Sequence, residues 1–236
     1  LGDVYKRQVE VQAPYGYVLD STPVPFDVTE ENSTQEGGIT LIKVDKPNMA
    51  QKGTISVEKT GEVFFGVNVF GEKDKDVIYQ PVYTVKGLAG AVYEITADED
   101  VITPDGTLRY HKGDVVDTVT TDEDGTAKSK ELYLGKYTVV EIKAPNGMVI
   151  NNEKHSVELT YAGQDVAVTE TVTSFYNERQ KVKISLEKVL EQNDTFGIGT
   201  NDEIKNISFG LYAKEDIVSS SGTVTVSYTH LRAHET

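Results

Sequence analysis

The chain contains one short sequence pattern twice, at a nearly constant spacing. Residues 48–59 read NMAQKGTISVEK and residues 177–188 read NERQKVKISLEK, and the two align without a gap. A second pair, EVQAPYGYVLD from Glu10 and EIKAPNGMVIN from Glu141, lies the same distance apart to within two residues. A fixed period indicates repeated structural units. We therefore expect an array of units of about 130 residues rather than one globule.

The two ends of the chain are related as DNA rather than as protein. Residues 1–8 (LGDVYKRQ) can be encoded by a DNA element whose opposite strand encodes VSYTHLR, which is residues 226–232. Such ends resemble a sequencing adaptor that has been translated. Residues 1–8 and 226–236 are therefore predicted to be an adaptor artefact and are excluded from fold reasoning.

The repeat phase divides the remaining sequence into three parts. Residues 9–52 are predicted to be the C-terminal remnant of one domain, 53–180 a complete domain, and 181–225 the N-terminal remnant of a third. The junctions between them are short, and short linkers restrict domain motion. We expect a stiff rod.

The sequence pattern is almost entirely that of β-structure. Apolar and polar residues alternate in 54–58, 137–139 and 182–186, and clusters of Gly, Pro, Asp and Asn separate such segments. No window of helical length carries a 3.6-residue apolar stripe. This pattern predicts an antiparallel β-sandwich with little helix.

Composition excludes several classes of function. The formal net charge is −15, and no cluster of Lys or Arg offsets it, so we expect no nucleic-acid partner. No apolar run is long enough to span a membrane. The chain has no cysteine, so neither disulfides nor thiolate chemistry is available. We expect no cofactor and no metal, because the acidic segment 122–125 lacks the later ligands of a calcium loop.

Strand parity places three polar side chains on apolar faces. Side chains alternate with a period of two along a strand. The residues in phase are Ile55 and Val57 with Lys59, Tyr137 and Val139 with Glu141, Thr173 and Phe175 with Asn177, and, in the repeat, Ile184 and Leu186 with Lys188.

Buried polar groups are costly unless they satisfy one another. One interpretation of this set is a buried Lys59–Glu141 ion pair with a hydrogen bond from Asn177. The other is covalent, because burial lowers the pKa of a lysine and a neutral amine is a nucleophile. A protonated Glu141 would then polarise the Asn177 carbonyl and transfer protons as ammonia leaves. The product would be a Lys–Asn isopeptide bond.

Several motifs resemble the Cna protein B-type, or SpaA-type, domains of Gram-positive surface adhesins and pilins. They are SVEKTGE from Ser56, LAGAVYEI from Leu88, TTDEDGTA from Thr120, LYLGKYTVVEIKAPNGMVI from Leu132 and SFYN from Ser174. The resemblance implies an all-β protein of tandem Ig-like or prealbumin-like antiparallel β-sandwiches, one complete and two truncated. It also implies that Lys59 and Asn177 form the cross-link and that Glu141 promotes it.

The truncated units are expected to hold partial sites. Glu10 and Asn48 lack their lysine, and Lys188 lacks its glutamate and asparagine. Asp45 is an alternative acceptor to Asn48, because some family members use aspartate. In this family a tyrosine commonly follows the Pro-x-Gly motif. Tyr17 keeps it in the first unit, whereas Met148 takes its place in the second.

The resemblance implies a structural stalk segment of a bacterial cell-surface adhesin or pilin-like protein, outside the cell of a Gram-positive bacterium. Its cross-linking would be autocatalytic and single-turnover, so we expect no enzyme. The alternative is a ligand-binding adhesin module for a host matrix protein or glycan, marked by an exposed apolar patch on one sheet or on the hairpin expected at 103–114. In the stalk interpretation, such a partner would bind a tip domain outside this fragment. A third reading is an accessory domain of a secreted enzyme.

Overall fold

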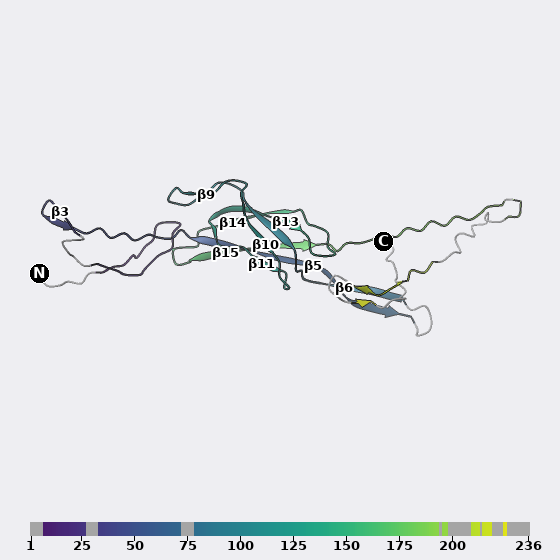
Figure 1. Cartoon of the computed structure of the whole chain (residues 1–236). Helices are drawn as coiled ribbons and strands as arrows, with labels where there is room; N and C mark the ends of the chain where they lie inside the picture. Colours follow the sequence, from purple (N-terminus) through teal and green to yellow (C-terminus); the bar gives the residue numbers. More distant parts are fainter. Residues whose placement is uncertain are drawn as a thin grey trace.

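The computed structural model describes residues 7–26, 33–71, 78–193, 195–197, 209–212, 214–218 and 224–225. These described residues form β-strands and turns without a helix, as predicted (Figure 1). The strands of the central region are β5 (Lys52–Phe70), β6 (Ile78–Gly87), β7 (Val92–Ala97), β8 (Val101–Ile102), β9 (Leu108–Tyr110), β10 (Val115–Thr120), β11 (Thr126–Lys128), β12 (Leu132–Tyr133), β13 (Gly135–Lys143), β14 (Lys154–Leu159) and β15 (Val168–Asn177).

Two sheets make up the central sandwich. One has the strand order β10-β7-β13-β14 and is antiparallel throughout. The other is organised around β5, which pairs antiparallel with β11, β12 and β6 and parallel with β15. The all-β class is therefore confirmed.

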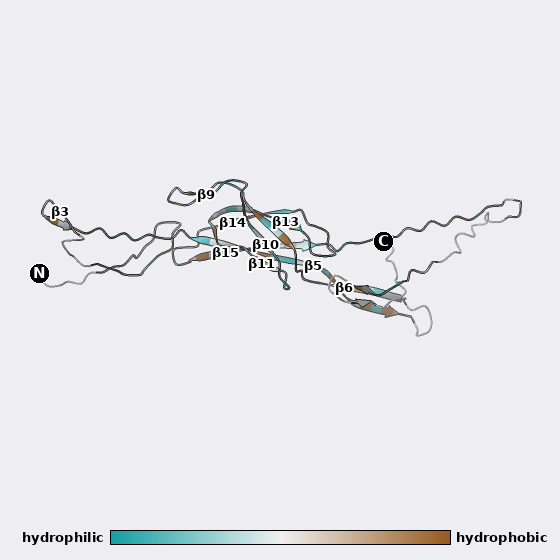
Figure 2. Ribbon diagram, viewed as in Figure 1, coloured by the Kyte–Doolittle hydropathy of each residue, from teal (hydrophilic) through white to brown (hydrophobic). Residues whose placement is uncertain are grey.

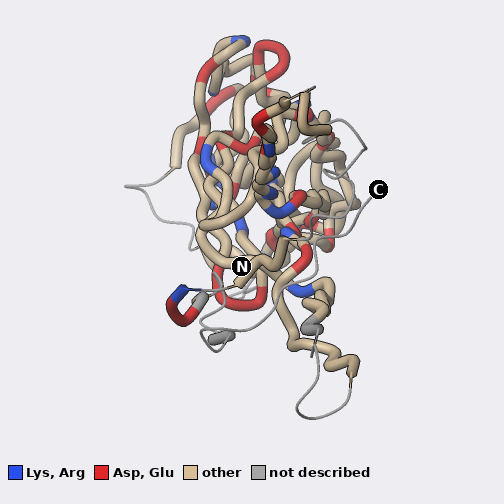
Figure 3. Tube along the Cα trace, turned by 90° about the vertical axis from the view of Figure 1, so that its right-hand side faces the viewer, with Lys and Arg blue, Asp and Glu red and all other residues tan. Residues whose placement is uncertain are grey.

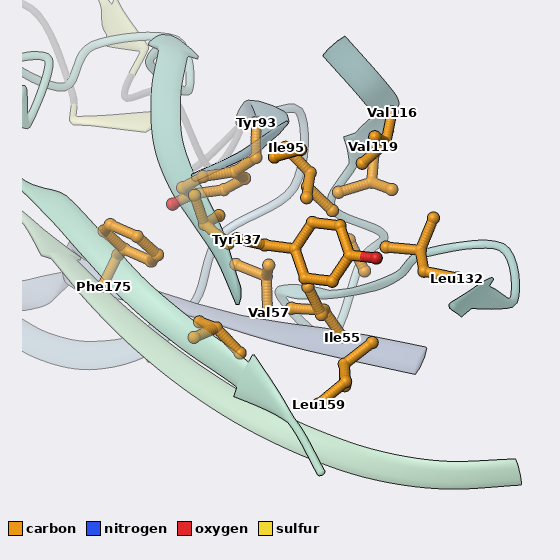
Figure 4. Close-up of a cluster of buried hydrophobic side chains, with 14 of the residues drawn as sticks. Ile55, Val57, Tyr93, Ile95, Val116, Val119, Leu132, Tyr137, Leu159 and Phe175 are labelled. Carbon is orange, nitrogen blue, oxygen red and sulfur yellow. The ribbon is translucent and has the colours of Figure 1, made fainter. Parts of the chain in front are cut away.

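Alternating apolar residues from both sheets fill the space between them. Figure 4 shows the Tyr137 ring of β13 lying among Ile55 and Val57 of β5 and Leu159 of β14. These four side chains are almost completely buried. Burying a side chain of this size contributes roughly 1.5–3 kcal/mol. This core fixes the inward face of β5, β13 and β15, the three strands that carry the candidate site.

The first and last strands of the sandwich are direct neighbours. β15 runs parallel to β5 over its full length, with Phe175 opposite Lys59 and Asn177 opposite Gly61. Because the two strands are parallel, the chain enters the sandwich at the start of β5 and leaves at the opposite end, after β15. The central domain is therefore threaded end to end, in keeping with the extended outline in Figure 1.

A long hairpin that the sequence did not predict extends from this sheet. β5 continues past Lys59, and its segment 60–70 pairs with β6, with a bulge between Phe64 and Gly66. The chain leaving β15 contacts the base of the hairpin: Arg179 stacks on the Tyr83 ring at 3.6 Å. A shorter hairpin was expected at 103–114; the structure has one formed by β8 and β9, which spans residues 101–110.

The N-terminal region is built of small strand pairs. β1 (Arg7–Gln8) pairs with β2 (Val24–Pro25), and β3 (Thr34–Glu36) pairs with β4 (Ile39–Leu41). β1 falls within the 1–8 segment assigned to an adaptor. Residues 1–6 and 226–236, the rest of both adaptor segments, lie outside the described residues.

The strand expected at 182–186 is a wrong prediction. Residues 180–192 form no ladder with any other described segment, and Val182, Ile184 and Leu186 are exposed. The alternation is present in the sequence, but a strand keeps an apolar face only when a second sheet covers it. The described part of 181–225 otherwise contains only the short pair β16 (Ile217–Val218) and β17 (Val224–Thr225).

Acidic residues are distributed along the whole trace rather than gathered at one place (Figure 3). Within the described residues there is no helix of the length and apolarity needed to cross a membrane.

Candidate functional site

Lys59, Glu141 and Asn177 meet between the two sheets of the central sandwich. Lys59 lies on β5 and Asn177 at the end of the adjacent β15, while Glu141 projects from β13 of the opposite sheet. Each of the three residues is 1% exposed. The burial expected from strand parity is therefore observed for all three.

The three side chains form a closed triangle of polar contacts. The Lys59 Nζ lies 3.1 Å from Glu141 Oε1 and donates a hydrogen bond to Asn177 Oδ1. The Asn177 Nδ2 donates to both carboxylate oxygens of Glu141, at 2.9 Å each. The sequence-based mechanism had Glu141 donating to the Asn177 carbonyl. In the structure Glu141 instead faces the amide nitrogen, and the carbonyl oxygen faces Lys59.

Aromatic rings separate this triangle from solvent. The Lys59 Nζ lies 5.9 Å from the ring centroids of both Tyr93 and Phe175. These two rings are in contact with each other, at a centroid distance of 4.7 Å, and the His155 ring stacks on Phe175 at a centroid distance of 3.9 Å. The amine therefore lies in an environment of low polarity with one carboxylate and one amide.

The electrostatics of the site follow from this burial. Loss of hydration lowers the pKa of Lys59 below its ordinary value, while the Glu141 carboxylate opposes the shift. Burial first, and then the Glu141 charge, raise the pKa of Tyr93, so its hydroxyl stays protonated. This hydroxyl has no hydrogen-bond partner of good geometry.

Two participants were not anticipated from the sequence. The backbone N–H of Asn151 donates to Glu141 Oε2 at 2.7 Å, which fixes the carboxylate from the side away from Lys59. The signal for it was the repeat itself, because Asp20, the counterpart of Asn151, donates in the same way to Glu10 Oε2 at 3.1 Å. Tyr93 was also missed, although it is in phase with the buried, apolar Ala91 and Ile95.

The partial site at the N-terminus repeats the asparagine–glutamate contact of the complete site. The Asn48 Nδ2 donates to Glu10 Oε1 at 2.9 Å and to Oε2 at 2.7 Å. Asp45, the alternative acceptor, is exposed and pairs with Lys43 at 3.2 Å. Asn48 is therefore the residue that the structure places against Glu10.

Lys188 does not lie on an apolar face as its parity suggested. It is exposed, in the segment that forms no strand. The expectation of a buried lysine in this part of the chain is corrected, and the reason is the missing partner sheet rather than the residue pattern.

No group of three or more His, Cys, Asp or Glu side chains is arranged to hold a metal ion within the part of the chain that the structure describes. Asp122, in the acidic segment considered above, accepts hydrogen bonds from the backbone N–H groups of Asp124 and Thr126. It therefore closes a β-turn.

The fold and the buried site define a β-sandwich domain with its first and last strands side by side. Residues 81–173 match the family model for SpaA, a prealbumin-like fold domain. The matched range contains Glu141, whereas Lys59 precedes it and Asn177 follows it.

Individual relatives show more distant similarity. The serine-aspartate repeat-containing protein F of Staphylococcus epidermidis is 29% identical over 167 residues, which cover 69% of this chain and 9% of that protein. The chain thus spans less than a tenth of the curated relatives it matches. Among solved structures, the Bacillus anthracis TIE protein is 25% identical with a TM-score of 0.38, covering 72% of this chain and 24% of that one. GBS52, the minor pilin of Streptococcus agalactiae, is 17% identical with a TM-score of 0.36, covering 70% and 62%.

Proposed function

We propose that this chain is a structural stalk segment of a Gram-positive cell-surface adhesin or pilin-like protein, stabilised by an isopeptide bond between Lys59 and Asn177. The observation that carries the proposal is the buried triangle. An amine with a lowered pKa faces a carboxamide whose nitrogen is bonded to both oxygens of the Glu141 carboxylate. The SpaA match over residues 81–173 supports the class of protein.

The reaction follows from the positions of the three groups. Glu141 accepts a proton from the Lys59 ammonium, 3.1 Å away, which frees the amine lone pair. The Nζ attacks the Asn177 Cγ, and the C–N bond to Nδ2 breaks as Glu141 delivers a proton to that nitrogen. The second proton lost by Nζ also passes to the departing nitrogen. Lysine ammonium and asparagine amide thus become one secondary amide and one ammonium ion, with Glu141 regenerated as a carboxylate.

Two features of the fold favour this reaction. The aromatic rings of Tyr93 and Phe175 exclude water, so hydration does not stabilise the charged ammonium form of Lys59. The neutral, nucleophilic amine is favoured as a result. The Asn151 N–H holds Glu141 in place, which keeps the carboxylate aligned with both nitrogens. The amide product also removes the cost of a buried cation. Each molecule reacts once, so the proposed chemistry is not that of an enzyme.

The bond would suit a stalk under tension. Lys59 and Asn177 are 118 residues apart in sequence, and closing a loop of ~100 residues stabilises a fold by about 4.7 kcal/mol on a chain-entropy estimate. Since β5 and β15 are parallel, force applied along the chain would pass from β5 through the bond to the end of β15. The strands between residues 60 and 176 would then be bypassed.

Peptide mapping tests the proposal. Digestion of the folded chain with trypsin should release a branched peptide in which the segment containing Lys59 is joined to the segment containing Asn177. Cleavage should also be absent after Lys59. Recovery of the two segments as separate peptides of unmodified mass would contradict the proposal.

A ligand-binding adhesin module remains the second candidate, and one observation favours it. The β5–β6 hairpin exposes Phe65, Val67 and Val69 at alternate positions, and brown, hydrophobic stretches lie along it in Figure 2. An exposed apolar face of this kind suits a protein partner. Replacing the three residues with serine should abolish binding to host matrix proteins if the hairpin is the contact. Unchanged binding, or none by the unaltered chain, would exclude this role for the hairpin.

A further inference from the structure

One junction between units is complete in this structure, and a buried glutamine holds it. Gln51 is 1% exposed although it lies in the linker that precedes β5. Its Nε2 donates to the carbonyl oxygens of Gly163, at 2.8 Å, and of Val166, and its Oε1 accepts from the Ala162 N–H at 2.8 Å. The side chain from the linker is thus bound entirely by the backbone of one loop of the following unit, residues 160–166.

The turn at residues 13–16 docks on the same end of the sandwich. The Tyr15 ring lies 4.7 Å from the Tyr161 ring of that loop. Gly16 has a φ of +84°, and a Cβ at this position would lie 2.5 Å from the Cγ of Pro104 on the β8–β9 hairpin. Only glycine allows this approach. Gln51 and Gly16 therefore form one buried surface against the loop 160–166 and Pro104, at the edge of which Tyr15 stays exposed.

The same surface is built again at the far end of the central unit. The backbone N–H of Gln180 donates to the Gly147 carbonyl at 2.9 Å, just as Gln51 donates to Gly16 at 2.8 Å. Gly147 has a φ of +76°, close to that of Gly16. Gln51 and Gln180 occupy the same place in the repeated sequence pattern. Gln180, however, is exposed, and so are Asn146 and Gly147 of the turn 144–147.

We propose that Gln180 and the turn 144–147 form the docking surface for the next domain of the same kind in the array. The partner it fits is a loop equivalent to 160–166, offering two backbone carbonyls and one backbone N–H to the Gln180 side chain. A carboxamide matches this set because it carries both a donor and an acceptor. The glutamine thereby sets the angle between successive sandwiches, so that one repeated residue would align the whole rod.

The occupied junction gives the first test. Because the chain has no cysteine, spin labels can be placed through Glu36→Cys and Lys130→Cys, both exposed and on either side of the junction. The unaltered junction should give one narrow distance distribution. Gln51→Ala leaves three backbone groups without partners and should raise the undocked, broad fraction by about tenfold or more. Gln180→Ala is the matched control and should change nothing. An unchanged distribution for Gln51→Ala would overturn the proposal.

The second test supplies the missing partner. A second copy of residues 52–180 is inserted directly after Gln180, so that Gln180 faces its loop 160–166. Labels at Lys130 and at its duplicate should give a narrow distribution, and Gln180→Ala should now broaden it about as much as Gln51→Ala does at the first junction. A broad distribution before any substitution, or no response to Gln180→Ala, would overturn the proposal. If the inserted copy does not fold, the Gln51→Ala experiment still decides whether a glutamine holds a junction.

Discussion

At the scale of single residues, the site resolves a conflict between burial and charge. Lys59 and Glu141 are buried beyond the reach of water, and removing one partner of a buried pair costs about 3–5 kcal/mol. Asn177 bonds to both, so that each charged atom has a neighbour. The same contacts bring together a nucleophile (Lys59), a proton carrier (Glu141) and an electrophile (Asn177).

Glu141→Gln should prevent the cross-link while keeping the size of the side chain, since a carboxamide cannot accept the Lys59 proton. Losing the closed loop lowers the melting temperature by about 10 °C or more. Circular dichroism melting measures it. Glu58→Gln, on the exposed face of β5, is the control and should change stability by no more than about 0.5 kcal/mol. Equal melting temperatures for Glu141→Gln and the unaltered chain would contradict the account.

The rate of cross-linking should rise with pH and then level off. Below the pKa of Lys59 the amine attacks only after its ammonium group has lost a proton, so the rate increases with pH, by at most about tenfold for each pH unit. Burial lowers the pKa of Lys59, so the plateau should begin below pH 10.5, the ordinary value for lysine. Mass spectra taken at intervals after refolding of urea-denatured, unreacted chain measure the rate. A rate that falls as pH increases would be inconsistent with an amine nucleophile.

At the scale of elements, the parallel pairing of β5 with β15 places the first and last strands side by side. The β5–β6 hairpin in turn depends on a tight return into the sandwich. Gly87, the last residue of β6, packs against the 122–125 turn. A Cβ there would lie 1.9 Å from the Asp124 carbonyl oxygen. Because this neighbour is backbone, it cannot rotate away.

Gly87→Ala should therefore destabilise the domain by about 1–3 kcal/mol, as overpacking does. Gly66→Ala in the same hairpin is the matched control, because nothing lies within 4 Å of its added Cβ. Its stability should be unchanged or slightly increased. Urea unfolding midpoints compare the two. Similar midpoints for both variants would show that the close contact at Gly87 does not affect the stability of the domain.

Sequence patterns predicted the elements that have a covered face and failed for those that do not. Alternation in β5, β13 and β15 was enough to place Lys59, Glu141 and Asn177 on the inside, because each strand has a sheet opposite it. The same alternation at 182–186 produced no strand. The β5–β6 hairpin was missed because its pairing depends on cross-strand contacts such as Phe64 with Tyr83, which a single-segment pattern does not contain. The Asn151 contact depends on a turn closing over Glu141.

At the scale of the whole molecule, we propose a rod whose units would be joined by short, docked linkers and closed internally by one bond each. Acidic residues occur at many places along the trace in Figure 3, and their net negative charge would keep such rods apart. A force applied along such a rod would be resisted by the proposed covalent bonds within units and by the Gln51 contacts between them.

Pulling single molecules by their ends should show this directly. The unaltered central domain should give no unfolding event for residues 60–176, since the bond between Lys59 and Asn177 carries the load. Glu141→Gln should add an extension of roughly 400 Å, the contour length of the released loop at about 3.5 Å per residue. The same extension in both proteins would mean that the first and last strands are not joined.

The most direct test of the central claim is the intact mass of the folded chain. The account predicts a mass lower than that of the printed sequence by one molecule of ammonia, and the full mass for Glu141→Gln after correction for the substitution. The full mass in the unaltered, folded chain would contradict it.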